Sequence, residues 1–199
     1  MQYPRLLALL ALSTLLLPCP AFAADKDEAG FTPLFNGKDF TGWRFTKQKA
    51  GDPIPANWKV ERGLICLTGG GSPNLVTERE YGDFEMRFEW RALKGKYNSG
   101  FYIRSGRETG SNQLNLAMGA EGGLVGGKAT GAKAVPQLQK PAGEWNVWRV
   151  VVKGDKVNFW CNGQPAWEAT GLKPDNGHIG LQAEGAPIEF RNLRLREIK

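Results

Sequence analysis

Residues 147–167 read VWRVVVKGDKVNFWCNGQPAW, and this stretch decides the fold. Apolar and polar residues alternate through it, as expected for strands that bury one face. Two turns interrupt the alternation, at Gly154-Asp155 and at Asn162-Gly163. Asn-Gly between alternating apolar residues is the strongest short-range signal for a β-hairpin. The stretch therefore predicts a meander of three antiparallel strands.

The rest of the chain shows no long helical period and consists of short alternating runs separated by turns. Such a pattern is typical of an all-β sandwich or barrel. In FEMRFEW (84–90) the apolar residues share one face of a strand, and Glu85, Arg87 and Glu89 share the other. Further strands are predicted at WKV (58–60) and LIC (64–66), which form a hairpin, at HIGLQAE (178–184) and at PIEFRNLRLREI (187–198).

The segment 106–143 lacks this alternation. It contains GAEGGLVGGKATGAK (119–133), which is rich in glycine and alanine and offers little to pack. A long loop without structure of its own is usually either disordered or functional. We predict a loop system that covers one face of the sandwich and contains a single helical turn.

The first residues have the order of a secretory signal peptide. Arg5 precedes the apolar run LLALLALSTLLL (6–17), and the small-residue end Ala21-Phe22-Ala23 follows it. We therefore expect a mature protein that is periplasmic or secreted. The expected organisation is a signal peptide at 1–23, a short linker at 24–30 and one domain at 31–199.

A lipoprotein is a second interpretation of this leader, because Leu16 and Cys19 have lipobox spacing, although Pro18 fits that interpretation poorly. The apolar run is too short to span a bilayer comfortably and no second run follows, so we expect no stable membrane insertion. The formal net charge is +6 and falls to +5 without Arg5. Basic and acidic residues are interspersed, with no basic run, which argues against a nucleic-acid partner.

Two cysteines, Cys66 and Cys161, remain after removal of the leader. In an oxidising compartment two cysteines can pair. Each of them, however, lies in an apolar strand pattern, where a free buried thiol is also ordinary. The sequence leaves the disulfide open. The single histidine, His178, has no cysteine cluster or second histidine to accompany it, so no zinc site is expected.

Many β-sandwiches of this size are glycosidases, which use a pair of carboxylates. Glu85 and Glu89 lie four residues apart on one strand face, or about 13 Å at the usual rise per residue. Glycosidase carboxylates are about 5 to 9.5 Å apart. We therefore interpret these two residues, with Arg87 between them, as a structural charge ladder.

A second set of polar side chains is typical of sugar binding. Amides and guanidinium groups hydrogen-bond to hydroxyls, and aromatic rings stack on a sugar face. Alternation in NSGFYIR (98–104) sends Phe101 and Ile103 into the core and the intervening residues to the opposite face, and Trp43 is a candidate stacking platform. The candidate cleft residues are Tyr102, Arg104, Gln113, Asn115, Gln182, Glu184, Glu189 and Arg191.

Several motifs resemble those of the 3-keto-disaccharide hydrolase domain family. They are LFNGKDFTGW (34–43), LVTEREYGDFEMRFEW (75–90), NSGFYIR (98–104), GEWNVWRVVVKGDKVNFWCNG (143–163) and GHIGLQAEGAPIEFRNLRLREI (177–198). The resemblance covers nearly the whole mature chain in order. It implies an all-β, concanavalin A-like (lectin/glucanase) jelly-roll sandwich. It also implies net hydrolysis of 3-keto-glycosides by elimination followed by hydration.

The chain departs from the family pattern at two places. Family members often carry a tract like Glu-x-Gln-x-x-Asp after the NSG strand, whereas this chain has Gln113, Asn115 and Met118. Where the family commonly has a histidine after GLQ, this chain has Glu184. The lost carboxylates put catalysis, and any metal that they would bind, in question.

On this resemblance the substrate is a carbohydrate, either an oxidised disaccharide or a glycoside. Glu184 would be the base, Arg104 would donate to the ketone or enolate, and no cofactor is assigned, with a divalent metal left open. The alternative is a lectin-like glycan-binding module that has lost the chemistry. The residues expected to bind substrate are Asn98, Tyr102, Gln113, Asn115 and Gln182.

Overall fold

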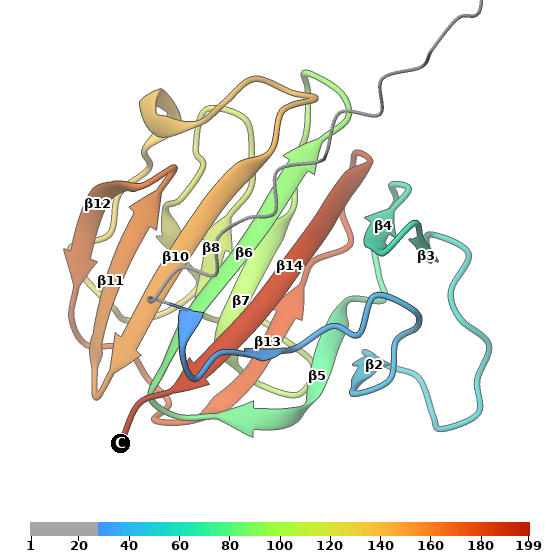
Figure 1. Cartoon of the computed structure of the whole chain (residues 1–199), viewed down its shortest axis with the longest axis horizontal. Coiled ribbons are helices and arrows are strands. Elements are labelled where there is room, and N and C mark those ends of the chain that lie inside the picture. The colour runs from blue at the N-terminus through green and yellow to red at the C-terminus, as the bar shows by residue number, and fades with distance from the viewer. Residues whose placement is uncertain (1–27) are drawn as a thin grey trace, which may run out of the picture.

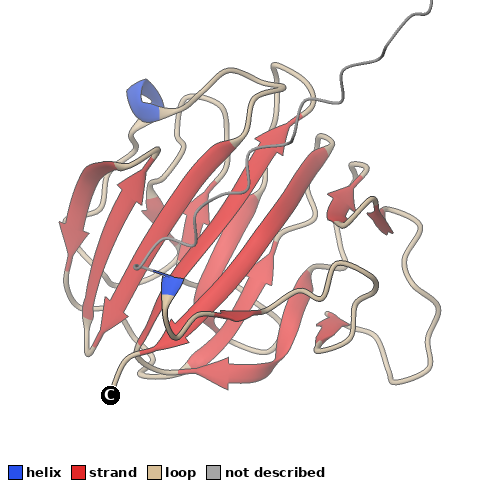
Figure 2. Ribbon diagram, viewed as in Figure 1, coloured by secondary structure: helices blue, strands red, loops and turns tan. Residues whose placement is uncertain are grey.

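Two β-sheets packed face to face form the molecule, as Figures 1 and 2 show. The computed structural model describes residues 28–199, so the predicted signal peptide and most of the predicted linker lie outside the described residues. The larger sheet has eight strands, with β1 (Thr32–Pro33) paired to β14. The other seven follow the order β12 (Gln164–Ala169), β11 (Lys156–Cys161), β10 (Asn146–Lys153), β6 (Phe84–Ala92), β14 (Ile188–Glu197), β4 (Leu64–Leu67) and β3 (Trp58–Glu61).

The smaller sheet has six strands and lies behind the larger one in Figure 1. Their order is β2 (Trp43–Phe45), β5 (Leu75–Tyr81), β13 (Gly177–Leu181), β7 (Gly100–Ser105), β8 (Gln113–Asn115) and β9 (Leu124–Val125). Every strand pairing in both sheets is antiparallel. Each sheet can therefore bury one face and leave the other exposed.

The predicted meander is confirmed. β10 pairs with β11, and β11 pairs with β12, through the two turns that the sequence places at Gly154-Asp155 and Asn162-Gly163. Asn162 and Gly163 both have positive φ, 51° and 80°, as the Asn-Gly turn requires. The hairpin of β3 and β4 is also confirmed.

The core lies between the two sheets and is dominated by aromatic side chains. Phe88 of the eight-stranded sheet stacks on Phe101 of the six-stranded sheet, with ring centroids 4.0 Å apart. Trp148 packs edge-on against Phe88 and against Trp90. All four side chains are at most 1% exposed. Offset or edge-on aromatic pairs of this kind add to the free energy gained by burying the rings.

The segment 106–143 is mostly loop, as predicted, and contributes only the short strands β8 and β9. Its one helical turn is the 3₁₀ helix η2 (Pro136–Leu138). Within residues 28–199 no helix is long and apolar enough to cross a membrane.

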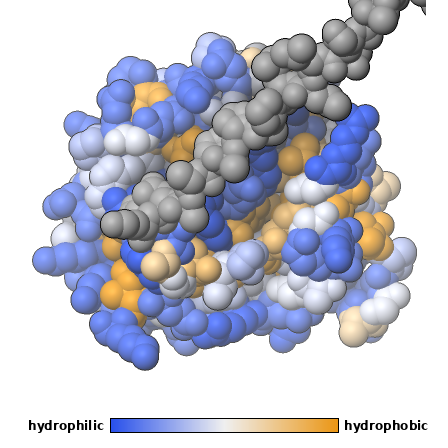
Figure 3. Space-filling view, viewed as in Figure 1, coloured by the Kyte–Doolittle hydropathy of each residue, from blue (hydrophilic) through white to orange (hydrophobic). Residues whose placement is uncertain are grey.

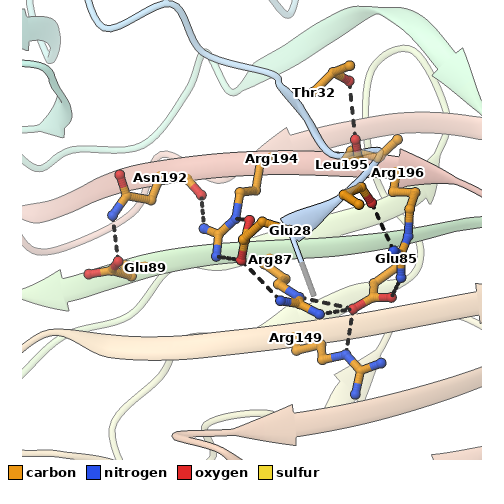
Figure 4. A network of polar contacts seen from close by, with 11 residues as sticks. Glu28, Thr32, Glu85, Arg87, Glu89, Arg149, Asn192, Arg194, Leu195 and Arg196 are labelled. Carbon is orange, nitrogen blue, oxygen red and sulfur yellow. Dashed lines mark hydrogen bonds and ion pairs between the residues drawn. The ribbon is translucent and has the colours of Figure 1, made fainter. Parts of the chain in front are cut away.

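The outer face of the eight-stranded sheet carries the predicted charge ladder, drawn in Figure 4. Glu85 is only 3% exposed and forms ion pairs with Arg149 and Arg196, both at 2.6 Å, and with Arg87 at 2.9 Å. Glu28 bridges Arg87 and Arg194. Burial by itself raises the pKa of Glu85, but the hydrogen bonds from the three arginines outweigh it and lower that pKa below the usual value.

Figure 3 shows this side of the molecule as largely hydrophilic, with scattered apolar residues. Glu189 and Arg191 belong to it, because they lie on β14 and pair with Arg91 and Glu89 at 2.7 Å each. The expectation that these two residues share a cleft with Gln113 and Glu184 is therefore wrong.

The two cysteines and Trp43 are buried. Cys66 and Cys161 are both buried free thiols, and burial raises the pKa of each. Trp43 is not a stacking platform: it lies in β2, is only 4% exposed and donates its indole N–H to the Leu34 carbonyl at 2.7 Å.

Candidate functional site

The outer face of the six-stranded sheet gathers most of the predicted polar residues. The strand register places Val76, Gly180, Tyr102 and Gln113 in one row across β5, β13, β7 and β8. Phe101 and Leu114, which pair in the next register position, point into the core instead. The glycine in the row is required by crowding, because a Cβ at Gly180 would lie 2.9 Å from Val76 and 3.2 Å from Tyr102.

Gln113 of this row and three side chains beside it form what we call the amide–carboxylate cluster: Asn98, Gln113, Gln182 and Glu184. Asn98 donates its amide N–H to Glu184 Oε1 at 2.6 Å. Gln113 donates to Gln182 Oε1 at 3.0 Å. Asn98 is exposed and the other three are partly exposed. The cluster therefore presents one carboxylate and three amides toward solvent.

The backbone beneath the cluster is fixed by Ser99. Its hydroxyl donates to the Gln182 carbonyl at 2.7 Å, and the Gln182 N–H donates to the Gly100 carbonyl at 2.8 Å. Ser99 is fully buried. The NSG turn thus joins the start of β7 to the end of β13, which explains why Asn98 and Glu184 meet although they are far apart in the sequence.

Tyr102 and Asn115 lie near the cluster but are partly committed elsewhere. Tyr102 is 4% exposed, and burial raises its pKa, with a smaller contribution in the same direction from the charge of Glu184. Asn115 accepts a hydrogen bond from the Ala117 N–H at 3.2 Å, which leaves its amide N–H₂ without a partner among the described residues. Asn115 can therefore donate to a ligand.

Arg104 does not lie in this site, so the expected cleft position of Arg104 is wrong. Its side chain is 1% exposed. The guanidinium donates to the Gly82 carbonyl at 2.8 Å, to the Gly154 carbonyl at 2.6 Å and to Asp83 Oδ1 at 2.6 Å. These partners lie in the β5–β6 turn and in the β10–β11 hairpin. Arg104 therefore ties the two sheets together at one end.

The local backbone explains the error. Alternation assigns faces correctly only while a strand remains extended. Arg104 has φ of 43°, in the left-handed region, and the register of β13 shifts between His178 and Gly180 beside it. The side chain consequently turns inward, whereas Tyr102, two residues earlier, faces outward.

A further pair next to the cluster was not foreseen. The Tyr97 hydroxyl donates to Glu121 Oε1 at 2.5 Å, and Glu121 is only 3% exposed. Burial and this hydrogen bond raise the pKa of Tyr97. The pair therefore attaches the loop after β8, which carries Glu121, to Tyr97, the residue directly before Asn98. Only the position of Tyr97 before the NSG triplet could have indicated it.

The loop 106–112, between β7 and β8, packs over the same sheet face. Glu108 accepts a hydrogen bond from the Lys47 N–H at 2.8 Å and forms an ion pair with Arg44 at 3.5 Å. Thr109 accepts one from the Asn74 amide at 2.9 Å. The loop thus divides the face, with the amide–carboxylate cluster on one side and β2 on the other.

Metal-ligand chemistry does not fit the cluster. Glu184 is its one carboxylate, and nowhere in residues 28–199 do three His, Cys, Asp or Glu side chains converge as a metal site. We therefore derive no step through a metal.

The fold is shared with solved structures of carbohydrate-active proteins. A candidate glycosyl hydrolase from Parabacteroides distasonis has a TM-score of 0.68 at 22% identity, over 90% of this chain and 99% of that one. A carbohydrate-binding module from Bacillus subtilis has a TM-score of 0.61 at 12% identity, over 78% and 96%. A Bacillus licheniformis β-glucanase has a TM-score of 0.59 at 14% identity, over 85% and 97%. These likenesses confirm the concanavalin A-like jelly-roll sandwich.

The family is shown by sequence. Residues 30–196 match the family described as the 3-keto-alpha-glucoside-1,2-lyase-like domain, and the chain belongs to it. A relative named 3-keto-disaccharide hydrolase, from Bacteroides thetaiotaomicron, is 24% identical in an alignment that covers 85% of this chain and 79% of the relative. The predicted family is confirmed, and the chain is a member of a carbohydrate-active, glycosyl hydrolase-like group.

Proposed function

We propose that this protein is an exported enzyme that cleaves 3-keto-glycosides at the amide–carboxylate cluster. Family membership supports the substrate class. The observation that carries the assignment of the site is the 2.6 Å hydrogen bond from Asn98 to Glu184. It holds one carboxylate oxygen in place beside amides that can bind sugar hydroxyls, and it leaves the second oxygen to act.

The chemistry follows from the ketone at C3, which acidifies the hydrogen at C2. The Glu184 carboxylate takes that proton, the C1–O bond breaks, and the departing oxygen leaves with a proton as an alcohol. Water then adds across the C1–C2 double bond, its oxygen at C1 and a proton at C2. The net change is hydrolysis. A positioned general base typically contributes about 10²–10⁴-fold to such a proton transfer.

Hydrogen-bond donors for the developing enolate must come from groups other than Arg104, because Arg104 is buried away from the site. The available donors on this face are the amide of Asn115 and that of Gln182, which accepts from Gln113 but donates to none of the described residues. Preorganised neutral donors stabilise an oxyanion without the cost of reorienting water.

A lectin-like glycan-binding module is the second candidate function. It is favoured by the amides at Gln113 and Asn115 and by Met118, which occupy the tract where the family often carries carboxylates. The likeness to a carbohydrate-binding module shows that the fold itself is compatible with binding alone.

Turnover of a 3-keto-disaccharide by the wild type, Glu184→Gln and Glu168→Gln separates these candidates. Glu168 is an exposed carboxylate on β12, in the other sheet. We expect wild-type turnover, a loss of about 100-fold or more in Glu184→Gln, and no change in Glu168→Gln. Sugar binding without turnover at any pH would favour the module, and full activity of Glu184→Gln would refute the assigned base.

Export is part of the proposal and rests on the leader at 1–23. Expression of the full chain in a bacterial host, followed by mass measurement of the periplasmic product, is expected to give a chain that starts at Ala24. A product that starts at an acylated Cys19 would instead support the lipoprotein interpretation, and retention of the leader would contradict export.

A further inference from the structure

A pocket of about 850 Å³ lies on the opposite side of the loop 106–112 from the amide–carboxylate cluster. The long loop 46–57, cyan at the edge of Figure 1, borders it, together with β2, β5 and β13. None of Asn98, Gln113, Gln182 and Glu184 lines it. We call it the β2–β5 pocket. Its volume is within the usual range for small-molecule sites.

The one histidine of the chain is built into the wall of this pocket. His178 is 6% exposed. Its Nδ1 lies 2.8 Å from the Thr77 carbonyl oxygen, so Nδ1 carries the hydrogen and Nε2 is the free nitrogen of the neutral ring. Nε2 is 3.5 Å from Glu80 Oε1, longer than an ordinary hydrogen bond. Nε2 thus has the Glu80 carboxylate as its neighbour in the wall of the pocket, at a distance that leaves this nitrogen able to hydrogen-bond to a ligand.

Two further polar side chains in the pocket are uncommitted. Among the described residues, the Glu78 carboxylate and the Arg107 guanidinium form no hydrogen bond or ion pair, and both are exposed. Glu78 and Glu80 lie on the same face of β5, two residues and therefore about 7 Å apart. At that spacing the two carboxylates can accept hydrogen bonds from two hydroxyls of one sugar ring.

The charges of the pocket cancel, because three acidic and three basic side chains line it: Asp52, Glu78, Glu80, Arg44, Lys49 and Arg107. A polyanion or a cation would meet groups of its own sign. Phe40, Phe45 and Ile54 supply an apolar wall beside the charged rim. Apolar surface together with carboxylate, guanidinium and imidazole groups matches the C–H faces and hydroxyls of an uncharged sugar.

We infer that the β2–β5 pocket is a second binding site for a neutral saccharide, with Glu78, Arg107 and His178 as its hydrogen-bonding groups. This site is separate from the amide–carboxylate cluster, and it does not rest on the proposed reaction. A carbohydrate would then bind on both sides of the loop 106–112.

The single histidine provides the test. Full-length protein labelled with ¹⁵N-histidine gives one set of imidazole NMR signals, which report on His178 alone. Titration with sucrose, trehalose, maltose and cellobiose is expected to shift these signals saturably for at least one sugar. Glu78→Ala and Arg107→Ala, both at exposed positions, are each expected to weaken that binding about tenfold or more while leaving the melting temperature unchanged.

Glu184→Gln and Glu144→Ala are the controls, the first in the other site and the second at an exposed position outside the pocket. Both are expected to bind the sugar at His178 as tightly as the wild type, whether or not Glu184→Gln retains activity toward a 3-keto-disaccharide. The inference is overturned if no sugar shifts the signals or if glucuronate, glucosamine or inorganic phosphate binds more tightly. It is also overturned if Glu184→Gln abolishes the shift.

Discussion

The Arg104 guanidinium donates to three acceptors in two turns that lie far apart in the sequence. Asp83 Oδ1 also accepts from the Gly154 N–H at 2.9 Å, so one carboxylate oxygen serves both turns. Because all three acceptors lie at one end of the sandwich, the arginine links the two sheets at that end. Its removal would leave the Gly82 and Gly154 carbonyls and the Asp83 carboxylate without this donor.

Arg104→Ala is therefore expected to lower the free energy of unfolding by about 3 kcal/mol, as for other partly buried charged pairs that lose one member. Chemical denaturation measures it. Arg62→Ala is a matched control, because Arg62 also has a positive φ, 52°, but is exposed. A loss of activity in Arg104→Ala at unchanged stability would instead restore the catalytic role that its sequence motif suggested.

The pairing of β7 with β8 positions the amide–carboxylate cluster. Gly100 faces Asn115 across the pair, and the Gln113 side chain packs directly over Gly100. A Cβ at Gly100 would lie 2.3 Å from the Gln113 side-chain amide. Gly100 ends the NSG turn, and it also leaves space for the Gln113 side chain, which hydrogen-bonds to Gln182.

Gly100→Ala is expected to displace Gln113, break its hydrogen bond to Gln182 and weaken sugar binding at the cluster about tenfold. The side-chain amide signals of Gln113 and Gln182 in NMR spectra would report the change. Gly95→Ala, at a glycine with no neighbour within 4 Å and no positive φ, should leave both signals and binding unaltered. Unchanged Gln113 signals in Gly100→Ala would contradict this packing.

Alternation and turn chemistry were sufficient to predict most strands, because β6, β10 and β11 each place an apolar side chain in the core at every second residue. They were not sufficient at Arg104, since a left-handed φ at an arginine within a strand has no signature in the sequence. Two family motifs indicated Asn98 and Glu184 as site residues, but neither their hydrogen bond nor the role of Ser99 in joining their strands was predicted. The pocket around His178 depends on a loop, 46–57, that has no periodic pattern.

The charged outer face of the eight-stranded sheet links stability to pH for the whole molecule. The pKa of Glu85 is lowered by its arginine partners despite burial, and that of Glu28 is lowered chiefly by its hydrogen bond from Arg194. A group with a lowered pKa in the folded state contributes stability above its unfolded pKa and loses it as the pH falls through the folded pKa. The fold should therefore weaken as the pH drops below the usual glutamate value of 4.5.

Glu85→Gln is expected to cost about 3 kcal/mol at pH 7, since it removes the central carboxylate from three guanidinium groups. It should also reduce the loss of stability between pH 7 and pH 3, measured by urea unfolding across that range. Glu144→Gln, at an exposed position, should follow the wild-type pH dependence. Parallel pH profiles for Glu85→Gln and the wild type would show that other groups control acid unfolding.

The central claim is that this sandwich cleaves 3-keto-glycosides by removing the C2 proton with Glu184. Hydrogen exchange at C2 tests it most directly: a 3-keto-disaccharide is incubated with enzyme in D₂O, and the released 3-keto sugar is analysed by NMR, with enzyme-free product as the control for spontaneous exchange. The account predicts deuterium at C2 of the product as soon as the product forms. With Glu184→Gln it predicts that no product is released. Release of product that retains its C2 hydrogen would contradict the account.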